Sequence, residues 1–197
     1  MKKGLLLTVA ACSLFSVSAN AKIWRPYIGV DYSYIDAKYE SPYNKQLAQE
    51  FNSVTGSVGI KLTTNLAVEG FYQQSLGSEN NTAYNTQLIN DGSDSSVKIK
   101  AYGVDLVSDF INLDMVEILT SVGIGQYKAD VNRNYYYGGK MMNVTNSFDG
   151  TGVRFGVGAQ VNITDSLGVR AMGRYVLTDV EAIKSIKEFT VGLRYTF

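Results

Sequence analysis

Hydrophobic and polar residues alternate strictly along residues 188–197, the last stretch of the chain. The apolar set is Phe189, Val191, Leu193, Tyr195 and Phe197, and the intervening set is Glu188, Thr190, Gly192, Arg194 and Thr196. A period of two places successive side chains on opposite faces of a β-strand. We therefore predict a strand with one aliphatic and aromatic face and one polar face that carries both signs of charge.

The same alternation recurs in earlier segments, which predicts an all-β protein. The predicted strands cover residues 27–34, 53–62, 66–73, 101–107, 116–125, 152–163, 167–177 and 188–197. Short connections at 63–65, 109–114 and 164–166 are separated by long ones near 38–52, 75–96, 131–149 and 178–185. Short turns on one rim and four long loops on the other are typical of an eight-stranded antiparallel up-and-down β-barrel.

The first 21 residues are predicted to be a cleaved secretory signal. Lys2 and Lys3 precede an interrupted apolar run, and Ala19-Asn20-Ala21 fits the small-residue cleavage pattern. The run is too short for a membrane-spanning helix. Cleavage at Cys12, the only cysteine, would leave an apolar run shorter than such signals normally have. We expect cleavage after Ala21, one barrel domain over residues 22–197, and no disulfide framework.

The alternation alone leaves two barrels open. A soluble lipocalin-like barrel would turn its apolar face inward around a ligand, and an outer-membrane barrel would turn that face toward lipid. The charges on the polar face favour the transmembrane barrel, because a narrow polar interior requires matched carboxylates and bidentate guanidinium groups. The acidic set is Asp31, Glu69, Asp105, Glu117 and Glu188, and the basic set is Lys61, Arg154, Arg170, Arg174 and Arg194. We predict that these residues form a charge network in the lumen.

Glycines and aromatic residues fit the same picture. The polar face also holds Gly29, Gly59, Gly123, Gly125, Gly152, Gly156, Gly158, Gly168 and Gly192, which would make room for long arginine side chains or allow strand curvature. Aromatic residues near strand ends suit the girdles at the two membrane interfaces: Trp24, Tyr32, Tyr34, Tyr72, Tyr175, Tyr195 and Phe197. Lys98 and Lys100 share a face with Tyr102, so we expect them to lie above the membrane or beside a bulge.

The mature chain resembles the small eight-stranded outer-membrane β-barrels of Gram-negative bacteria, the OmpA transmembrane-domain and opacity-protein-like group. The resemblance rests on "WRPYIGVDYSYI", "TTNLAVEGFYQQ", "TSVGIGQY", "GVRFGVGAQVNITDSLGVRAMGRYVL" and "EFTVGLRYTF". It implies that the barrel-assembly machinery reads the last strand, with Phe197 as the terminal aromatic and Phe189, Val191, Leu193 and Tyr195 on the same face. The resemblance also implies that the lipid of the outer membrane surrounds the barrel. Unlike the longer OmpA-type proteins, this sequence ends at the barrel.

The sequence offers little catalytic chemistry. It contains no histidine and no cysteine after Cys12, so the usual base of hydrolytic triads and the ligands of soft-metal sites are missing. We expect no enzyme activity, no catalytic or cofactor-binding residue and no metal site. The balance of 18 basic and 18 acidic residues argues against a nucleic-acid partner.

Three functions stay open at this stage. The first is a structural and surface-interaction protein with a plugged lumen and four outward loops, in which Arg133, Tyr135, Tyr136 and Tyr137 of the third loop contact a host or surface ligand. The second is a narrow, porin-like ion channel that opens when the arginine–carboxylate network rearranges. The third is a secreted soluble barrel whose cavity, lined by Val157, Ala159 and Val161, binds a small apolar ligand.

Overall fold

Eight of the nine strands in the described part of the chain are 10 to 23 residues long, and β4 has 5 residues. The computed structural model describes residues 24–39, 50–76, 78–82, 93–113, 115–137, 140–180 and 183–197, so the predicted signal lies outside the described residues. The strands are β1 (Arg25–Tyr39), β2 (Glu50–Lys61), β3 (Leu66–Ser75), β4 (Ser78–Thr82), β5 (Ser93–Leu113), β6 (Val116–Tyr137), β7 (Lys140–Asn162), β8 (Leu167–Thr178) and β9 (Ile183–Thr196). The described part of the chain contains no helix long and apolar enough to cross a membrane.

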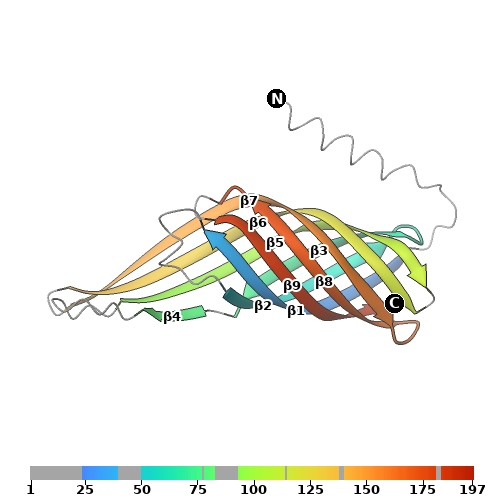
Figure 1. Cartoon of the computed structure of the whole chain (residues 1–197), viewed down its shortest axis with the longest axis horizontal. Helices are drawn as coiled ribbons and strands as arrows, with labels where there is room; N and C mark the ends of the chain where they lie inside the picture. The colour runs from blue at the N-terminus through green and yellow to red at the C-terminus, as the bar shows by residue number, and fades with distance from the viewer. Residues whose placement is uncertain are drawn as a thin grey trace, which may run out of the picture.

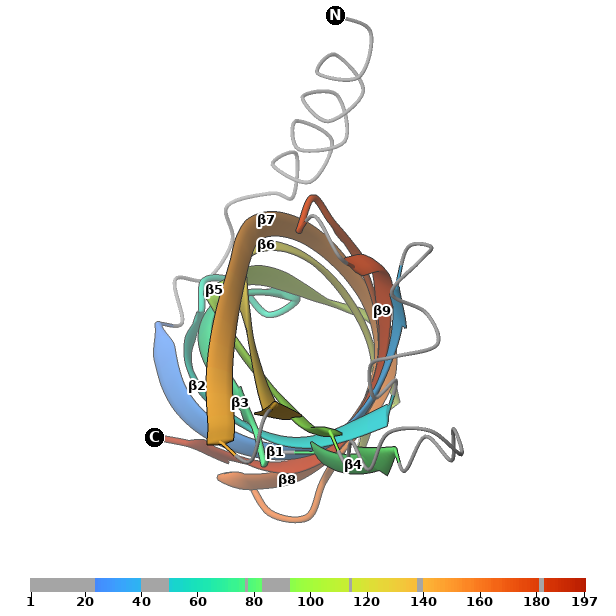
Figure 2. The same cartoon turned by 90° about the vertical axis from the view of Figure 1, so that its left-hand side faces the viewer.

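Eight of these strands close into a barrel, which confirms the predicted fold. Each pairs antiparallel with its neighbours in the order β3-β2-β1-β9-β8-β7-β6-β5, and a β3–β5 pairing joins the two ends of the series. Figure 2 looks into the resulting ring. The short strand β4 is an addition, because it pairs only with the first residues of β5, where β3 no longer accompanies it. A closed ring leaves no sheet edge facing lipid.

The connections differ from prediction on the side of the long loops. β6 and β7 pair continuously as far as Tyr137 and Lys140, so most of the predicted loop 131–149 is strand. Figure 1 shows this pair, together with β4 and the first part of β5, extending past the ends of the remaining strands. We call the outer part of the β6–β7 pair, residues 131–149, the arm. Its polar composition suggested a loop, but the antiparallel ladder satisfies backbone hydrogen bonds whatever the side chains are.

Four further connections are shorter than predicted or lie partly outside the described residues. Between β8 and β9 only residues 179–182 intervene, and β5 continues to Leu113 through a register irregularity at Asp109/Ile111, so the predicted turn 109–114 is mostly strand. Residues 40–49 of the predicted connection 38–52 lie outside the described residues. The predicted connection 75–96 contains β4 and the first residues of β5, so it is partly strand, and its residues 77 and 83–92 lie outside the described residues. The turns 62–65 and 163–166 agree with prediction and lie on the rim that also holds both barrel ends, where the Phe197 N–H donates to the Pro26 carbonyl at 3.0 Å.

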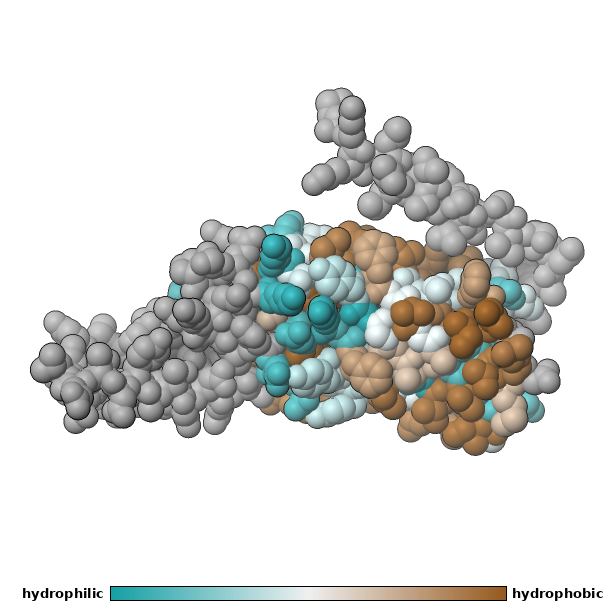
Figure 3. Space-filling model, viewed as in Figure 1, coloured by the Kyte–Doolittle hydropathy of each residue, from teal (hydrophilic) through white to brown (hydrophobic). Residues whose placement is uncertain are grey.

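The outward face of the barrel is apolar beside the short-turn rim and polar beyond it. In Figure 3 the hydrophobic half surrounds the end where the chain terminates, and a hydrophilic band borders it on the side away from that end. Cross-strand aromatic pairs with exposed rings mark the border: Tyr34 with Phe189, Tyr72 with Tyr102, and Phe155 with Tyr175. One outward position further, four strands carry Asp36, Gln74, Lys100 and Lys187. Aromatic rings followed by charges are typical of a membrane–water interface.

Two sequence-based expectations, the soluble barrel and the position of Lys98 and Lys100, can be checked on this outward face. Val157 and Val161, which a soluble barrel would turn into its cavity, face outward with 60% and 41% of their surface exposed, so the soluble alternative is wrong. Lys98 and Lys100 lie in the hydrophilic band beyond Tyr102. β5 keeps an unbroken register with β6 there, but on its other side the pairing passes from Gln74↔Lys100 on β3 to Ser78↔Val97 on β4 with a shift of one residue, so an irregularity does lie beside Lys98.

Candidate functional site

The polar face of the strands turns into the barrel lumen and carries the charged residues selected from the sequence. Each of the eight barrel strands contributes at least one of them. All are buried except Lys61, whose side chain is 24% exposed at the short-turn rim. Alternation explains the common direction, since every selected residue occupies the inward parity of its strand.

Two arginines and two carboxylates form the centre of the network. Arg170 donates bidentately to Glu69, with both N···O distances at 2.8 Å. Arg194 donates bidentately to Asp31 at 2.9 and 2.7 Å. The two pairs are linked, because Arg170 lies 3.6 Å from Asp31 and Arg194 lies 3.7 Å from Glu69. Such fork-to-fork pairs are strong and geometrically specific, and they offset the desolvation of four buried charges.

The other two arginines lie further toward the arm. Arg154 contacts Asp105 at 2.9 Å, and its guanidinium carbon lies 3.8 Å from the centre of the Phe71 ring. Arg174 lies 3.7 Å from Glu188. Cation–π contact with Phe71 supplies part of the stabilisation that a second carboxylate would give to Arg154.

Residues that the sequence analysis did not select complete the network. Tyr27 donates to Glu69 at 3.0 Å, Gln73 donates to Glu188 at 2.8 Å, and Arg174 donates to the Thr190 hydroxyl at 3.1 Å. Lys61 pairs with Asp109 at 3.4 Å. Inward parity could have identified Tyr27, Gln73 and Thr190, whereas Asp109 had been assigned to a turn.

Glycines provide the space that this network occupies. A Cβ atom on Gly29 would overlap the Arg194 guanidinium, and one on Gly192 would overlap the Asp31 carboxylate. A Cβ atom on Gly123 would likewise overlap the Asp105 carboxylate. Because an eight-stranded lumen is only wide enough for side chains to fill, the absence of a side chain at these positions is what lets the charged groups lie flat against the wall.

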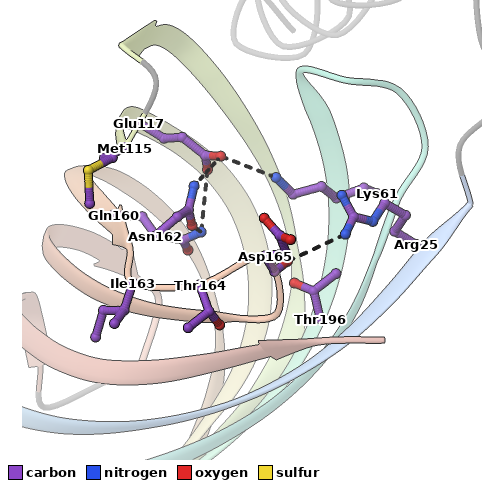
Figure 4. A pocket seen from close by; sticks show the side chains of 10 residues that line it. All are labelled: Arg25, Lys61, Met115, Glu117, Gln160, Asn162, Ile163, Thr164, Asp165 and Thr196. Atoms are coloured by element: carbon purple, nitrogen blue, oxygen red, sulfur yellow. Dashed lines mark hydrogen bonds and ion pairs between the residues drawn. The ribbon is translucent and has the colours of Figure 1, made fainter.

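The short-turn rim opens into a polar pocket of about 570 Å³. Figure 4 shows the side chains that line it: Arg25, Lys61, Met115, Glu117, Gln160, Asn162, Ile163, Thr164, Asp165 and Thr196. Glu117 accepts from Asn162 at 2.9 Å and from Gln160 at 3.3 Å, and Lys61 lies 3.6 Å away. Lys61 and Glu117 therefore form an ion pair at the mouth, and Arg25 donates to the backbone carbonyl of Asp165 at 3.5 Å.

The lumen beyond the charge network is apolar, which the sequence analysis did not anticipate. The buried cluster there consists of Ile35, Ala37, Phe51, Phe71, Ile99, Ala101, Tyr127, Ala129, Val176, Val180, Ile183 and Ile186, with Phe148 packed against it. We call it the apolar layer. Most of these residues share the inward parity of the charged set. Ile183 does not, because it lies where the β1–β9 register shifts, and Val180 lies between β8 and β9. The sequence analysis expected a uniformly polar interior and therefore did not select them. Along the barrel axis the lumen thus passes from polar mouth to charge network to apolar layer.

The other selected residues lie outside the lumen or outside the described side chains. Phe189, Val191, Leu193, Tyr195 and Phe197 all face outward on or directly after β9, and the Tyr195 and Phe197 rings pack edge to face at 5.2 Å. The side chains of Arg133 and Tyr135–Tyr137 lie outside the described residues, although their backbone belongs to β6 in the arm. Within the described ranges, no group of His, Cys, Asp or Glu side chains could hold a metal ion.

Comparison with known families decides what kind of barrel this is. The family described as "Outer membrane protein beta-barrel domain" matches residues 7–197. The chain belongs to this family. It is therefore an outer-membrane, transmembrane β-barrel protein, as the resemblance implied, and its apolar outward face lies in the lipid of that membrane. No curated protein matches the chain in sequence.

Solved outer-membrane barrels share the fold of this outer-membrane protein. Neisserial surface protein A matches with a TM-score of 0.62 and 18% identity, covering 87% of this chain and 97% of that one. Ail, the attachment invasion locus protein of Yersinia pestis, matches with 0.59 and 15%, covering 88% and 99%, in a complex with the heparin analogue sucrose octasulfate. A major outer membrane protein from Thermus thermophilus matches with 0.58 and 9%, covering 87% and 99%. At these identities the likeness extends to the fold alone.

Proposed function

We propose that this outer-membrane barrel is a structural and surface-interaction protein whose lumen is plugged. The observation that supports the plug most directly is that the charge network and the apolar layer fill the lumen one after the other along the barrel axis. Ions would have to displace the doubly bidentate network of Asp31, Glu69, Arg170 and Arg194 and then cross the buried apolar layer. If only the charge network or only the apolar layer opened, the other would still block the lumen.

Planar-bilayer recordings test the plug. The refolded wild-type barrel should give no discrete current steps at any voltage the bilayer tolerates. The alternative function is a narrow ion-conducting channel, and the polar mouth pocket is the feature that favours it. Reproducible wild-type currents that disappear in Arg154→Ala or Glu117→Ala would establish the channel and reject the plug.

The surface-interaction part of the proposal concerns the arm. The β6–β7 ladder projects past the membrane-facing belt, and its end carries Arg133 and three consecutive tyrosines, a composition common in recognition surfaces. Ail, a barrel of the same fold, is seen with a heparin analogue. Sulfated polysaccharide is thus a reasonable first probe for the arm, with Arg133→Gln as the variant expected to bind it less.

Intact-cell labelling tests whether the arm faces outward. A short epitope inserted at residues 138–139, between β6 and β7, should bind antibody on intact cells. The same epitope inserted in the turn at 163–166 should bind only after the outer membrane is permeabilised. Reversed labelling would place the arm in the periplasm and refute the display function.

The export and assembly route belongs to the same proposal. Removal of residues 1–21 by cleavage after Ala21 would leave Lys22 as the first residue, which the mass of the mature protein checks. The barrel-assembly machinery would read the lipid-facing row from Phe189 to Phe197. We assign no enzyme activity, cofactor or metal to the protein, because the lumen groups that could do acid–base chemistry are engaged in ion pairs.

A further inference from the structure

The pocket at the short-turn rim contains charged groups that the ion pairs of the lumen do not use. It is lined by two cations and two carboxylates: Arg25, Lys61, Glu117 and Asp165. Lys61 and Glu117 pair with each other at 3.6 Å. Arg25 and Asp165 are exposed, and neither forms an ion pair within the described part of the chain. The pocket therefore presents one unpaired charge of each sign.

Arg25 lies where a bound anion would be stabilising. It is the direct cross-strand partner of Lys61 in the β1–β2 ladder, and both side chains line the mouth. Like charges directly opposite each other destabilise a sheet. Lys61 is compensated by Asp109 and Glu117. Arg25 has only a 3.5 Å hydrogen bond to the backbone carbonyl of Asp165, so most of its N–H donors are available to a carboxylate.

The pocket also offers an acceptor for a cation. Figure 4 shows Arg25 and Lys61 on one side of the pocket, Glu117 with its amide donors on the other, and Asp165 between them. The carboxylate of Asp165 accepts no hydrogen bond from a described residue. It can bind an ammonium group while Arg25 binds a carboxylate of the same molecule. A ligand with one charge of each sign matches this arrangement, whereas a simple anion would also meet the unpaired carboxylate.

Two apolar side chains add a further element of recognition. Met115 and Ile163 are 60% and 55% exposed and line the same pocket. An apolar group placed against them removes apolar surface from water, which is favourable. The pocket volume of about 570 Å³ lies within the range of small-molecule sites.

The pocket ends at the charge network. Behind the Lys61–Glu117 pair only about 20 Å³ of space remains beside Arg170 and Arg194. A molecule that enters from the rim must therefore leave by the rim, so the site binds a ligand without passing it through the lumen. If the arm faces outward, as proposed above, the pocket opens to the periplasm.

We propose that the mouth pocket binds a small zwitterion with an apolar side chain, such as an apolar amino acid. Arg25 holds its carboxylate, Asp165 holds its ammonium group, and Met115 and Ile163 contact its side chain. The proposal uses neither the plug nor the arm, so its test does not depend on the function of either.

A chemical-shift titration of the isotope-labelled mature barrel tests the site in maltoside micelles, whose uncharged headgroups do not compete with a zwitterion. L-Leucine is the probe, and it should shift the amide signals of Thr164, Asp165 and Thr196 with saturation. Three analogues separate the contributions. Isocaproate is leucine without the ammonium group, isopentylamine is leucine without the carboxylate, and glycine lacks the apolar side chain. Each should bind more weakly than leucine, by about fivefold for each exposed ion pair that is lost.

Two variants assign the charges. Arg25→Gln and Asp165→Asn should each weaken leucine by about fivefold. Arg25→Gln should not weaken isopentylamine further, because that analogue lacks the group that Arg25 holds. Lys187→Gln and Asp36→Asn make the same charge changes at the other end of the barrel, where the two residues are cross-strand partners, and should leave leucine binding unchanged.

Several results would overturn the proposal. Leucine that leaves the rim amides unshifted would remove the site, and isocaproate and isopentylamine that both bind as tightly as leucine would remove the role of paired charges. Glycine as tight as leucine would remove the apolar contact. Equal weakening by the control variants would mean general charge attraction. Each variant is first checked for heat-modifiable migration on a denaturing gel, and the comparison of the four ligands on the wild type needs no variant.

Discussion

Replacing Glu69 by glutamine is the most direct perturbation of the lumen network. Glu69 is 1% exposed and accepts three hydrogen bonds, two from Arg170 at 2.8 Å and one from Tyr27 at 3.0 Å. The amide has nearly the same shape but no charge, and its NH₂ group would face a guanidinium donor. The linked group would then hold two arginines and the single carboxylate Asp31.

The expected cost follows from this imbalance. Breaking a buried ion pair by neutralising one partner typically costs about 3–5 kcal/mol, because a desolvated charge is left uncompensated. Asp31 already lies 3.6 Å from Arg170 and can take over part of the interaction. We therefore expect Glu69→Gln to lower the free energy of unfolding by about 3 kcal/mol, at the lower end of that range.

Urea unfolding in phosphatidylcholine vesicles measures this cost, with the single tryptophan, Trp24, as the fluorescent reporter. Glu50→Gln is the matched control, because it makes the same chemical change at an exposed position and should stay within about 0.5 kcal/mol of wild type. Adding Arg170→Gln to Glu69→Gln should recover stability, since the unpaired charge is removed. A loss below about 1 kcal/mol for Glu69→Gln, or no recovery in the double variant, would refute the reading of a tightly coupled buried network.

Three further predictions test the lumen space, the lipid face and assembly. Gly192→Ala should cost about 1–3 kcal/mol because its methyl would overlap the β1 carbonyl and carboxylate beside it, whereas Gly56→Ala, with open space around it, should be nearly neutral in the same unfolding assay. Val58→Lys on the lipid-facing belt should cost about 2–4 kcal/mol and Asn52→Lys in the hydrophilic band about 0–1 kcal/mol; equal costs would contradict the assigned membrane position. Phe197→Ala should slow the appearance of heat-modifiable barrel in pulse-labelled cells, and an unchanged rate would remove its role as the terminal assembly signal.

The strands and their faces follow from local sequence, whereas the connections do not. Alternation at residues 167–177 agrees closely with β8, because a strand with one face toward lipid and one toward the lumen has a period of two. The predicted strand 188–197 matches the later part of β9, which begins five residues earlier at Ile183. The arm is different, since residues 131–149 mix polar side chains with apolar ones such as Met141, Val144 and Phe148, and the sequence analysis found no sustained alternation there. Only the continued pairing of β6 with β7 identifies it as strand.

In the lumen, too, some features follow from the sequence and others do not. Sequence parity selected the ten charged residues of the network and the glycines beside them, because a narrow interior restricts which residue types can face inward. Ile35, Phe51 and Ile99 also have inward parity, but parity alone does not predict that they lie at one level of the barrel and form a separate apolar layer. That grouping depends on the relative shift of neighbouring strands around the ring.

The sequence by itself determined the strand content, the two faces of each strand and the balance of buried charge, since these depend on period and composition. Only the tertiary structure decided which arginine meets which carboxylate. Arg170 on β8 reaches Glu69 on β3, 101 residues away and across the barrel, and the Asp31–Arg194 pair spans 163 residues. Such partners depend on the closure of the ring and on the register of each strand pair. Neither can be predicted from a local stretch of the chain.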